Sequence, residues 1–182
     1  MSAIKKRIRL IALLCGAMIA VFVVDLYLQG ALKAFGIFPR SQERLPFILS
    51  APFIHGNWQH LLNNLPGFAV LSFLCMAKST RFYLWASAFI IIVSGLLVWC
   101  FARQAVHIGA SGWIFGLWAL CLAQAYFSRS LMNIVIALLV LIFYGGMVFG
   151  MFPQGKGVSF EAHIFGAVAG FLCAFLFSKK IR

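Results

Sequence analysis

Residues 82–127 read FYLWASAFIIIVSGLLVWCFARQAVHIGASGWIFGLWALCLAQAYF, and this stretch decides the fold class. Two apolar runs, 82–102 and 111–127, flank a short polar segment that contains Arg103 and His107. A helix needs about 20 mostly apolar residues to cross a bilayer. The stretch therefore predicts two membrane-spanning helices joined by a short loop.

The composition of the whole chain supports a membrane protein. Of its 182 residues, 64% are hydrophobic and 10% are charged, whereas a soluble domain carries about 25% charged residues. The net charge of +12 does not indicate nucleic-acid binding, because the basic residues form short clusters between apolar runs and no stripe on a folded face. Such clusters are typical of membrane flanks, so we expect lipid and no nucleic acid as a partner.

The same pattern extends to both ends of the chain and predicts an all-α polytopic membrane protein. We expect one membrane domain, 1–182, built as a bundle of six transmembrane helices with no soluble accessory domain. The N-terminal apolar run lacks a small-residue cleavage site, so we interpret it as an uncleaved span. The predicted spans are about 8–28, 58–77, 82–102, 111–127, 131–152 and 162–178.

The distribution of Lys and Arg predicts the orientation. With a cytoplasmic N-terminus, ten of these residues fall on inner segments and five on outer segments. Cytoplasmic segments carry the excess of positive charge. We therefore expect both termini in the cytoplasm, an even number of spans, and the inner membrane of a bacterium as the location.

Four polar side chains lie at the outer ends of three spans. His60 and Asn64 are four residues apart, which places them on one helix face, and Ser111 and His163 open the fourth and sixth spans. Because spans two, four and six run in the same direction, all four side chains are expected in one shallow outer layer. Ionisable residues inside a membrane span are candidates for function.

These residue types suit nucleophilic catalysis. A serine hydroxyl needs a base to accept its proton, and histidine titrates near neutral pH. The oxyanion formed by attack on an amide needs hydrogen-bond donors, which the free amide of Ser111 at a helix N-terminus and the side chains of His60 and Asn64 can supply. Neither Asp25 nor Glu161 is well placed to complete a triad, so we predict a Ser111–His163 dyad.

No cofactor and no metal are expected. The five cysteines lie in apolar runs without a CxxC pattern, and neither an HExxH motif nor a pair of intramembrane aspartates is present.

Small residues are spaced to let two of these spans approach each other. Gly112 and Gly116 form a GxxxG face on the fourth span, and Ala162, Gly166 and Gly170 form a matching face on the sixth. Such faces allow close packing of helix backbones in lipid. We expect this packing to bring His163 to Ser111, with Phe115 stacked on the imidazole ring.

Each motif alone also has a purely structural interpretation. The glycines can serve helix packing only, and the His60/Asn64 pair can be an interhelical hydrogen-bond site. We interpret His55 as a structural hydrogen-bonding residue and His107 as a loop residue, and we assign Trp58, Trp99 and Trp113 to an interfacial aromatic belt. The joint occurrence of the polar residues at one depth favours catalysis.

The combination resembles the rhomboid family of intramembrane serine proteases. The resemblance covers essentially the whole chain and rests on HLLNN at 60–64, GASG at 109–112 and AHIFGAVAG at 162–170. It implies that Ser111 is the nucleophile and His163 the general base. It also implies that His60, Asn64 and the Ser111 amide line the oxyanion hole, and that Gly109 shapes the loop before the nucleophile. The chain has Glu43-Arg44 where many rhomboids have Trp-Arg, which leaves the docking of the first outer loop open.

The resulting prediction is an intramembrane serine endopeptidase that cleaves transmembrane segments of other proteins near the outer membrane face. The loop 153–161 is expected to cap the site. Two alternatives remain: a catalytically inactive rhomboid-like protein that binds membrane clients, and a channel or transporter, which would distribute polar residues through the membrane depth. The substrate and the oligomeric state do not follow from the sequence.

Overall fold

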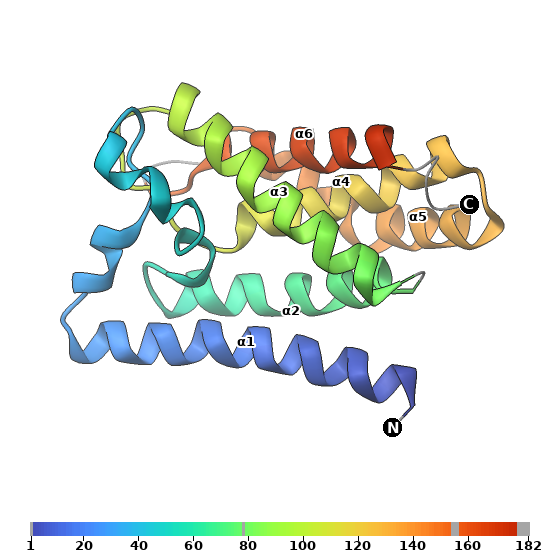
Figure 1. Ribbon diagram of the computed structural model, residues 1–182, viewed down its shortest axis with the longest axis horizontal. Coiled ribbons are helices and arrows are strands. Elements are labelled where there is room, and N and C mark those ends of the chain that lie inside the picture. The colour runs from blue at the N-terminus through green and yellow to red at the C-terminus, as the bar shows by residue number, and fades with distance from the viewer. Residues whose placement is uncertain (1, 78, 154–156, 178–182) are drawn as a thin grey trace.

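The computed structural model describes residues 2–77, 79–153 and 157–177, which form a bundle of six α-helices (Figure 1). The helices are α1 (Ala3–Tyr27), α2 (Trp58–Cys75), α3 (Thr80–Phe101), α4 (Ser111–Ser128), α5 (Leu131–Tyr144) and α6 (Phe160–Phe177). Short 3-10 helices lie between them: η1 (Ala31–Phe35), η2 (Gln42–Ile48), η3 (Ala51–Phe53) and η4 (Gly145–Met151). Helices α2, α4 and α6 all begin at the end of the bundle that holds η1 to η3, as Figure 1 shows.

Helix α4 lies at the centre of this bundle. It packs against α2, α3, α5 and α6, and its residues Leu117 and Leu120 are completely buried. A helix that is apolar on all sides belongs in the interior of a protein. The nucleophile candidate Ser111 is therefore the first residue of the most buried helix.

Capping residues explain where the helices begin. The side chains of Ser2, Asn57, Ser79 and Ser130 each accept a hydrogen bond from a backbone N–H in the first turn that follows, which is the usual role of an N-cap. Helices α1 and α3 consequently start before the predicted positions 8 and 82. Hydropathy locates the part of a helix that lies in lipid, whereas the cap locates its first turn.

The predicted fifth span, about 131–152, corresponds to the apolar helical stretch Leu131–Met151, but its last part is not α-helical. The α-helix ends at Tyr144, and the chain continues as the 3-10 helix Gly145–Met151. Glycine is a poor helix former, and the pair Gly145-Gly146 stands at the point of change. The change matters because it turns the backbone carbonyl of Gly150 toward α6.

Four stretches of the described chain are long and apolar enough to cross a membrane: α1, α3, Leu131–Met151 and α6. Helices α2 and α4 do not reach this criterion, and α2 carries His60, Asn63 and Asn64 in its first two turns. The protein is thus an all-α membrane protein, and the count of six crossings stays a prediction. Lys78, Lys156 and the basic cluster 179–182 lie outside the described residues, so the orientation also stays a prediction.

Helices α4 and α6 touch through their main chains. A methyl group added to Gly112 would lie 3.2 Å from the carbonyl oxygen of Ala162. Methyl groups at Gly166 and Gly170 would overlap the carbonyl oxygens of Gly112 and Gly116. The close approach predicted from the spacing of small residues is confirmed, and it explains why these positions hold glycine.

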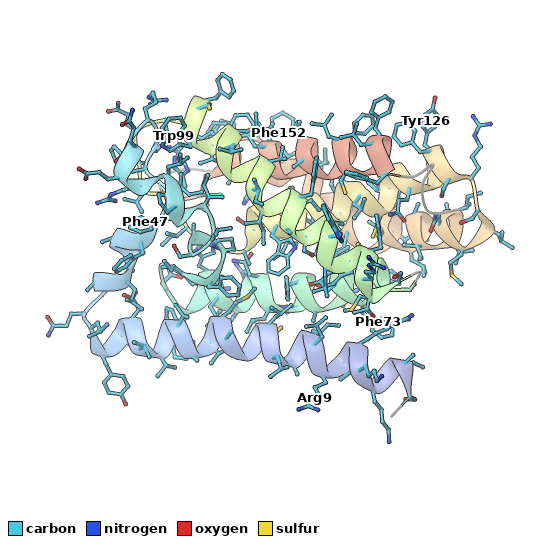
Figure 2. All side chains as sticks on the ribbon, in the orientation of Figure 1. Arg9, Phe47, Phe73, Trp99, Tyr126 and Phe152 are labelled. Carbon is cyan, nitrogen blue, oxygen red and sulfur yellow. The ribbon has the colours of Figure 1, made fainter. Side chains whose placement is uncertain are left out.

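The long first connection folds back onto α3. The indole of Trp99 donates a hydrogen bond to the carbonyl of Ser41 at 2.8 Å, and Arg40 donates to the carbonyl of Ala102 at 3.1 Å. Arg44, from the Glu43-Arg44 pair, lies over the ring of Phe38 at 5.6 Å. Figure 2 shows Phe47 and Trp99 at this end of the bundle, with Tyr126 toward the opposite end, where α1 begins and α6 ends.

Replacing Gly166 with alanine should destabilise the bundle, because the added methyl group meets a backbone oxygen that cannot move aside. Overpacking of this kind costs about 1–3 kcal/mol or more. The control is Gly16→Ala in α1, where the new methyl group meets nothing within 4 Å. Unfolding of both variants in detergent, by heat or by SDS, should show a loss of stability for Gly166→Ala alone. Equal stabilities of the two variants would contradict the packing described above.

Candidate active site

His163 lies in the first turn of α6, and its ring is fixed by one hydrogen bond. The Nδ1 atom is 2.7 Å from the carbonyl oxygen of Gly150 in η4. Because a carbonyl only accepts, Nδ1 must carry the hydrogen and donate it. The neutral ring then has Nε2 as its proton acceptor, which is the state that a general base requires.

The ring of Phe115 holds the same imidazole from one side. The two rings stack with centroids 4.2 Å apart and planes 2° from parallel, as the sequence predicted. A side chain at Gly150 would lie 2.7 Å from Cζ of Phe115, so only glycine fits between the ring and the backbone. Sequence reasoning missed Gly150, whose only signal was a glycine near the end of a predicted span.

Ser111 opens α4 immediately after an N-cap without a capping side chain. The N-cap residue is Ala110, which makes no side-chain hydrogen bond to the helix. The first N–H groups of a helix have no partner within it, so the Ser111 amide is available to a ligand. The contact between Gly112 and Ala162 brings the turn that carries Ser111 against the turn that carries His163.

His60 presents a hydrogen-bond donor toward the same region. The backbone N–H of Gly56 donates to Nδ1 of His60 at 3.4 Å, which leaves the hydrogen of the neutral ring on Nε2. The side chain of Asn64, buried in α2, donates one of its two amide hydrogens to the carbonyl of His60 at 2.9 Å. The second amide hydrogen is left for another acceptor.

Gly109 is required by two independent features. Its φ angle is +110°, a conformation that side chains disfavour. A methyl group there would also lie 2.5 Å from Nε2 of His60. The loop before Ser111 therefore passes directly over the His60 ring, and this passage brings residues from α2 and α4 together.

The two acidic residues considered for a triad have other partners. Glu161 is 3.5 Å from Nε of Arg103, and Asp25 accepts a hydrogen bond from the backbone of Leu32 at 2.8 Å. The bond from His163 to Gly150 thus occupies the position that a carboxylate holds in a triad. The orienting group in this protein is a main-chain carbonyl.

The structure bears out the assignment of His107 to a loop and corrects the assignment of Trp113. His107 is buried and hydrogen-bonded to Ser159 and Arg103, so it is a structural residue within its loop. Trp113 is only 4% exposed and packs edge-on against Phe68, so its assignment to the aromatic belt is wrong. Hydropathy alone does not distinguish a tryptophan at the interface from one turned toward the neighbouring helix.

His55 is completely buried beside the site. Its Nδ1 lies 3.3 Å from the carbonyl of Phe53, and its ring lies 5.1 Å from that of His60. Burial, reinforced by His60, lowers the pKa of His55 to about 4. The residue is therefore neutral at physiological pH and acts as a structural hydrogen-bonding residue, as expected.

A small cavity of about 40 Å³ lies beside the loop before Ser111, lined among others by His107, Gly109, Gly112 and Ala162. The rest of the lining is mostly apolar, with Ile37, Ile48 and Val98 among it, so the pocket offers few hydrogen-bond partners to a water molecule. Within the described residues, no group of three or more His, Cys, Asp or Glu side chains could hold a metal ion.

Comparison with known proteins identifies the family. The Rhomboid domain matches residues 42–180. An uncharacterized protein of Mycobacterium tuberculosis is 38% identical over 92% of this chain and 77% of its own length. A putative rhomboid protein of Acanthamoeba polyphaga mimivirus is 33% identical over 77% of this chain and 79% of its own length. The chloroplastic rhomboid-like protein 11 of Arabidopsis thaliana is 26% identical over 88% of this chain and 62% of its own length.

The fold is that of an all-α membrane protein with a polar layer at one end of the bundle. The chain belongs to the rhomboid family.

Replacing Gly109 with alanine should be more harmful than replacing Gly157. Both glycines have a φ angle near +110°, but a methyl group at Gly157 meets nothing within 4 Å, whereas one at Gly109 meets His60. Strain in this backbone region costs about 1–3 kcal/mol, and only Gly109→Ala adds a steric clash. Thermal unfolding in detergent should give a lower midpoint temperature for Gly109→Ala than for Gly157→Ala. The opposite order would contradict the described path of the loop.

The stability should fall in acid because of His55. Its pKa of about 4 in the folded protein lies below the ordinary value near 6.5, so the unfolded chain binds the proton first. The contribution is fully present above about pH 6.5 and is lost as the pH falls toward 4, by up to about 3 kcal/mol. Unfolding measured from pH 8 to pH 4 should show this loss, and His55→Gln should show a smaller one. Identical pH profiles for both proteins would refute the assignment.

Proposed function

We propose that this rhomboid-family protein is an intramembrane serine endopeptidase that uses a Ser111–His163 dyad. The observation that carries the proposal is the bond from Nδ1 of His163 to Gly150, together with the parallel Phe115 ring. These contacts leave Nε2 as a basic nitrogen in a helix turn that packs against the turn of Ser111.

In the proposed reaction, Oγ of Ser111 attacks the carbonyl carbon of a peptide bond while Nε2 of His163 takes the hydroxyl proton. The imidazolium then gives this proton to the leaving amine, and an acyl group remains on the serine. Water adds to the acyl group with His163 again acting as the base, which regenerates the serine and releases the second product.

The oxyanion formed in each step needs donors that are in place beforehand. The proposal assigns this role to the Ser111 amide, Nε2–H of His60 and the second amide hydrogen of Asn64. Loss of one such donor in known serine proteases costs about 2.7–4 kcal/mol of transition-state stabilisation. The hydrogen bonds described for His60 and Asn64 support the proposal because each leaves one N–H group of the side chain available to an oxyanion.

The substrates are proposed to be transmembrane segments of other proteins, cut near the outer membrane face. The proposal includes six crossings, cytoplasmic termini and the inner membrane of a bacterium. It is supported by the arrangement of the helices, because α1 begins and α6 ends at one end of the bundle and the polar layer lies at the other (Figure 1). Part of the loop 153–161, predicted to cap the site, lies outside the described residues, and its role as a cap stays a prediction.

The second candidate is an inactive rhomboid-like protein that binds membrane clients. It is disfavoured because a protein that only binds clients does not require a histidine whose tautomer is fixed by the Gly150 carbonyl. Nor does it require hydrogen-bond donors beside Gly109 that remain available to a ligand.

Purified protein in liposomes should cleave at least one member of a panel of single-span substrates. Ser111→Ala and His163→Ala should each abolish cleavage, because the nucleophile or its base is lost. A fluorophosphonate should label Ser111 in the natural sequence and fail to label the His163→Ala variant. The control is Ser128→Ala, at the opposite end of α4. Equal cleavage by all four proteins would rule out the dyad, and intact binding of clients without labelling would favour the inactive alternative.

A further inference from the structure

Arg103, in the loop between α3 and α4, contacts the start of α6 through several groups. Its Nη2 donates a hydrogen bond to the carbonyl of Val158 at 2.6 Å, and its Nε lies 3.5 Å from Oε1 of Glu161. The guanidinium also lies 5.4 Å from the centre of the Phe160 ring. These contacts involve three of the four residues from Val158 to Glu161, a segment that ends two residues before His163.

His107 reaches the fourth residue of this segment. Its Nε2 lies 3.0 Å from the carbonyl of Arg103 and must donate to it, so the neutral ring accepts the hydroxyl hydrogen of Ser159 at Nδ1, at 2.6 Å. Burial lowers the pKa of His107, which keeps the ring in this neutral form.

Ser159 links His107 to the first turn of α6, which carries His163. Its hydroxyl oxygen accepts the N–H of Ala162 at 3.3 Å, and its carbonyl accepts the N–H of His163 at 3.4 Å. Ser159 is therefore the residue that caps α6. A hydrogen-bonded path runs from His107 through this cap to the backbone of His163.

The loop that carries Arg103 and His107 is itself held by hydrogen bonds to the first connection. The backbone of His107 exchanges two hydrogen bonds with Ile37, of 2.8 and 3.0 Å, and the N–H of Gly109 donates to the carbonyl of Ala51 at 2.9 Å. Two residues later the same loop becomes the first turn of α4, with Ser111. One anchored segment thus ends in the candidate nucleophile and holds the helix of the candidate base.

We propose that Arg103 and His107 are positioning residues that clamp Val158–Glu161 and thereby hold His163 in register with Ser111. The catalytic consequence rests on the proposed function, whereas the clamp is a property of the fold. The glycines of α4 and α6 set the distance between the two helices, and the clamp sets the height and rotation of the first turn of α6. Misplacement by about 1 Å can reduce an enzymatic rate about a hundredfold, so the clamp acts on the rate of the chemical step.

The test uses matched pairs of variants in the whole chain. Ser159→Ala removes the hydroxyl that His107 and Ala162 share, and Ser159→Thr keeps a hydroxyl. Arg103→Gln removes the charge beside Glu161, and Arg103→Lys keeps it. The control is Arg44→Gln, which removes another outer arginine that lies over an aromatic ring and belongs to η2 rather than to the clamp.

Two readouts are measured on each protein in liposomes: kcat and KM for cleavage of a single-span substrate, and hydrogen exchange of the segment 160–165. We expect Ser159→Ala and Arg103→Gln to lower kcat about tenfold to a hundredfold with KM little changed, and to speed exchange at the start of α6. Ser159→Thr should recover most of kcat, Arg103→Lys part of it, and Arg44→Gln should match the natural sequence.

The outcomes separate the two proposals. If the natural sequence neither cleaves nor reacts with a fluorophosphonate, the proposed function fails, and the hydrogen exchange of segment 160–165 alone tests the clamp. Faster hydrogen exchange in both clamp variants supports the clamp, and unchanged hydrogen exchange overturns it. If the natural sequence cleaves, an unchanged kcat in the clamp variants, a change in KM alone, or an equal loss in Arg44→Gln overturns the clamp.

Discussion

The contact between the main chains of α4 and α6 is the interaction on which the rest of the structure depends. Gly112 follows Ser111 directly, and Ala162 precedes His163 directly, so this contact joins the two turns that carry the polar residues. In lipid, helices gain little from the hydrophobic effect when they associate, and close van der Waals packing takes its place. A side chain larger than hydrogen at Gly166 would force the backbones apart and separate the two residues by the same movement.

A second constraint acts at the polar end of the bundle, where three connecting segments meet. Backbone and side-chain bonds join Ile37 to His107, Ala51 to Gly109, and His107 to Ser159. The opposite half of the helices is mostly apolar, including the adjacent thiols of Cys75 and Cys121. Polar groups are costly inside a membrane, so gathering them at one end gives the protein an ordered polar layer with few buried charges.

Most of this arrangement was predictable from the sequence. Apolar runs located the helices, and the spacing of Gly112, Gly116, Gly166 and Gly170 predicted which two helices touch. The one-turn offset between Ser111 and Phe115 predicted the ring that stacks on His163. These features are periodic and local, and helix geometry converts them directly into positions in space.

The parts that could not be predicted depend on backbone groups and on loops. The sequence does not reveal that the chain tightens after Tyr144, so the carbonyl of Gly150 could not be foreseen as the partner of His163. The buried roles of His107 and Trp113 depend on how distant segments fold over one another. Such contacts join residues far apart in the chain, as between His107 and Ser159, and no local periodicity records them.

The choice of a carbonyl as the partner of His163 has a consequence for the charge of the resting protein. An aspartate in that position would place a permanent negative charge within the membrane, where ionised side chains are strongly disfavoured. The Gly150 carbonyl sets the tautomer of His163 without adding a charge, and Glu161, which lies two residues before this histidine, is paired with Arg103. The folded state thus avoids the standing cost of a further ionised carboxylate beside His163, a cost that a triad would impose.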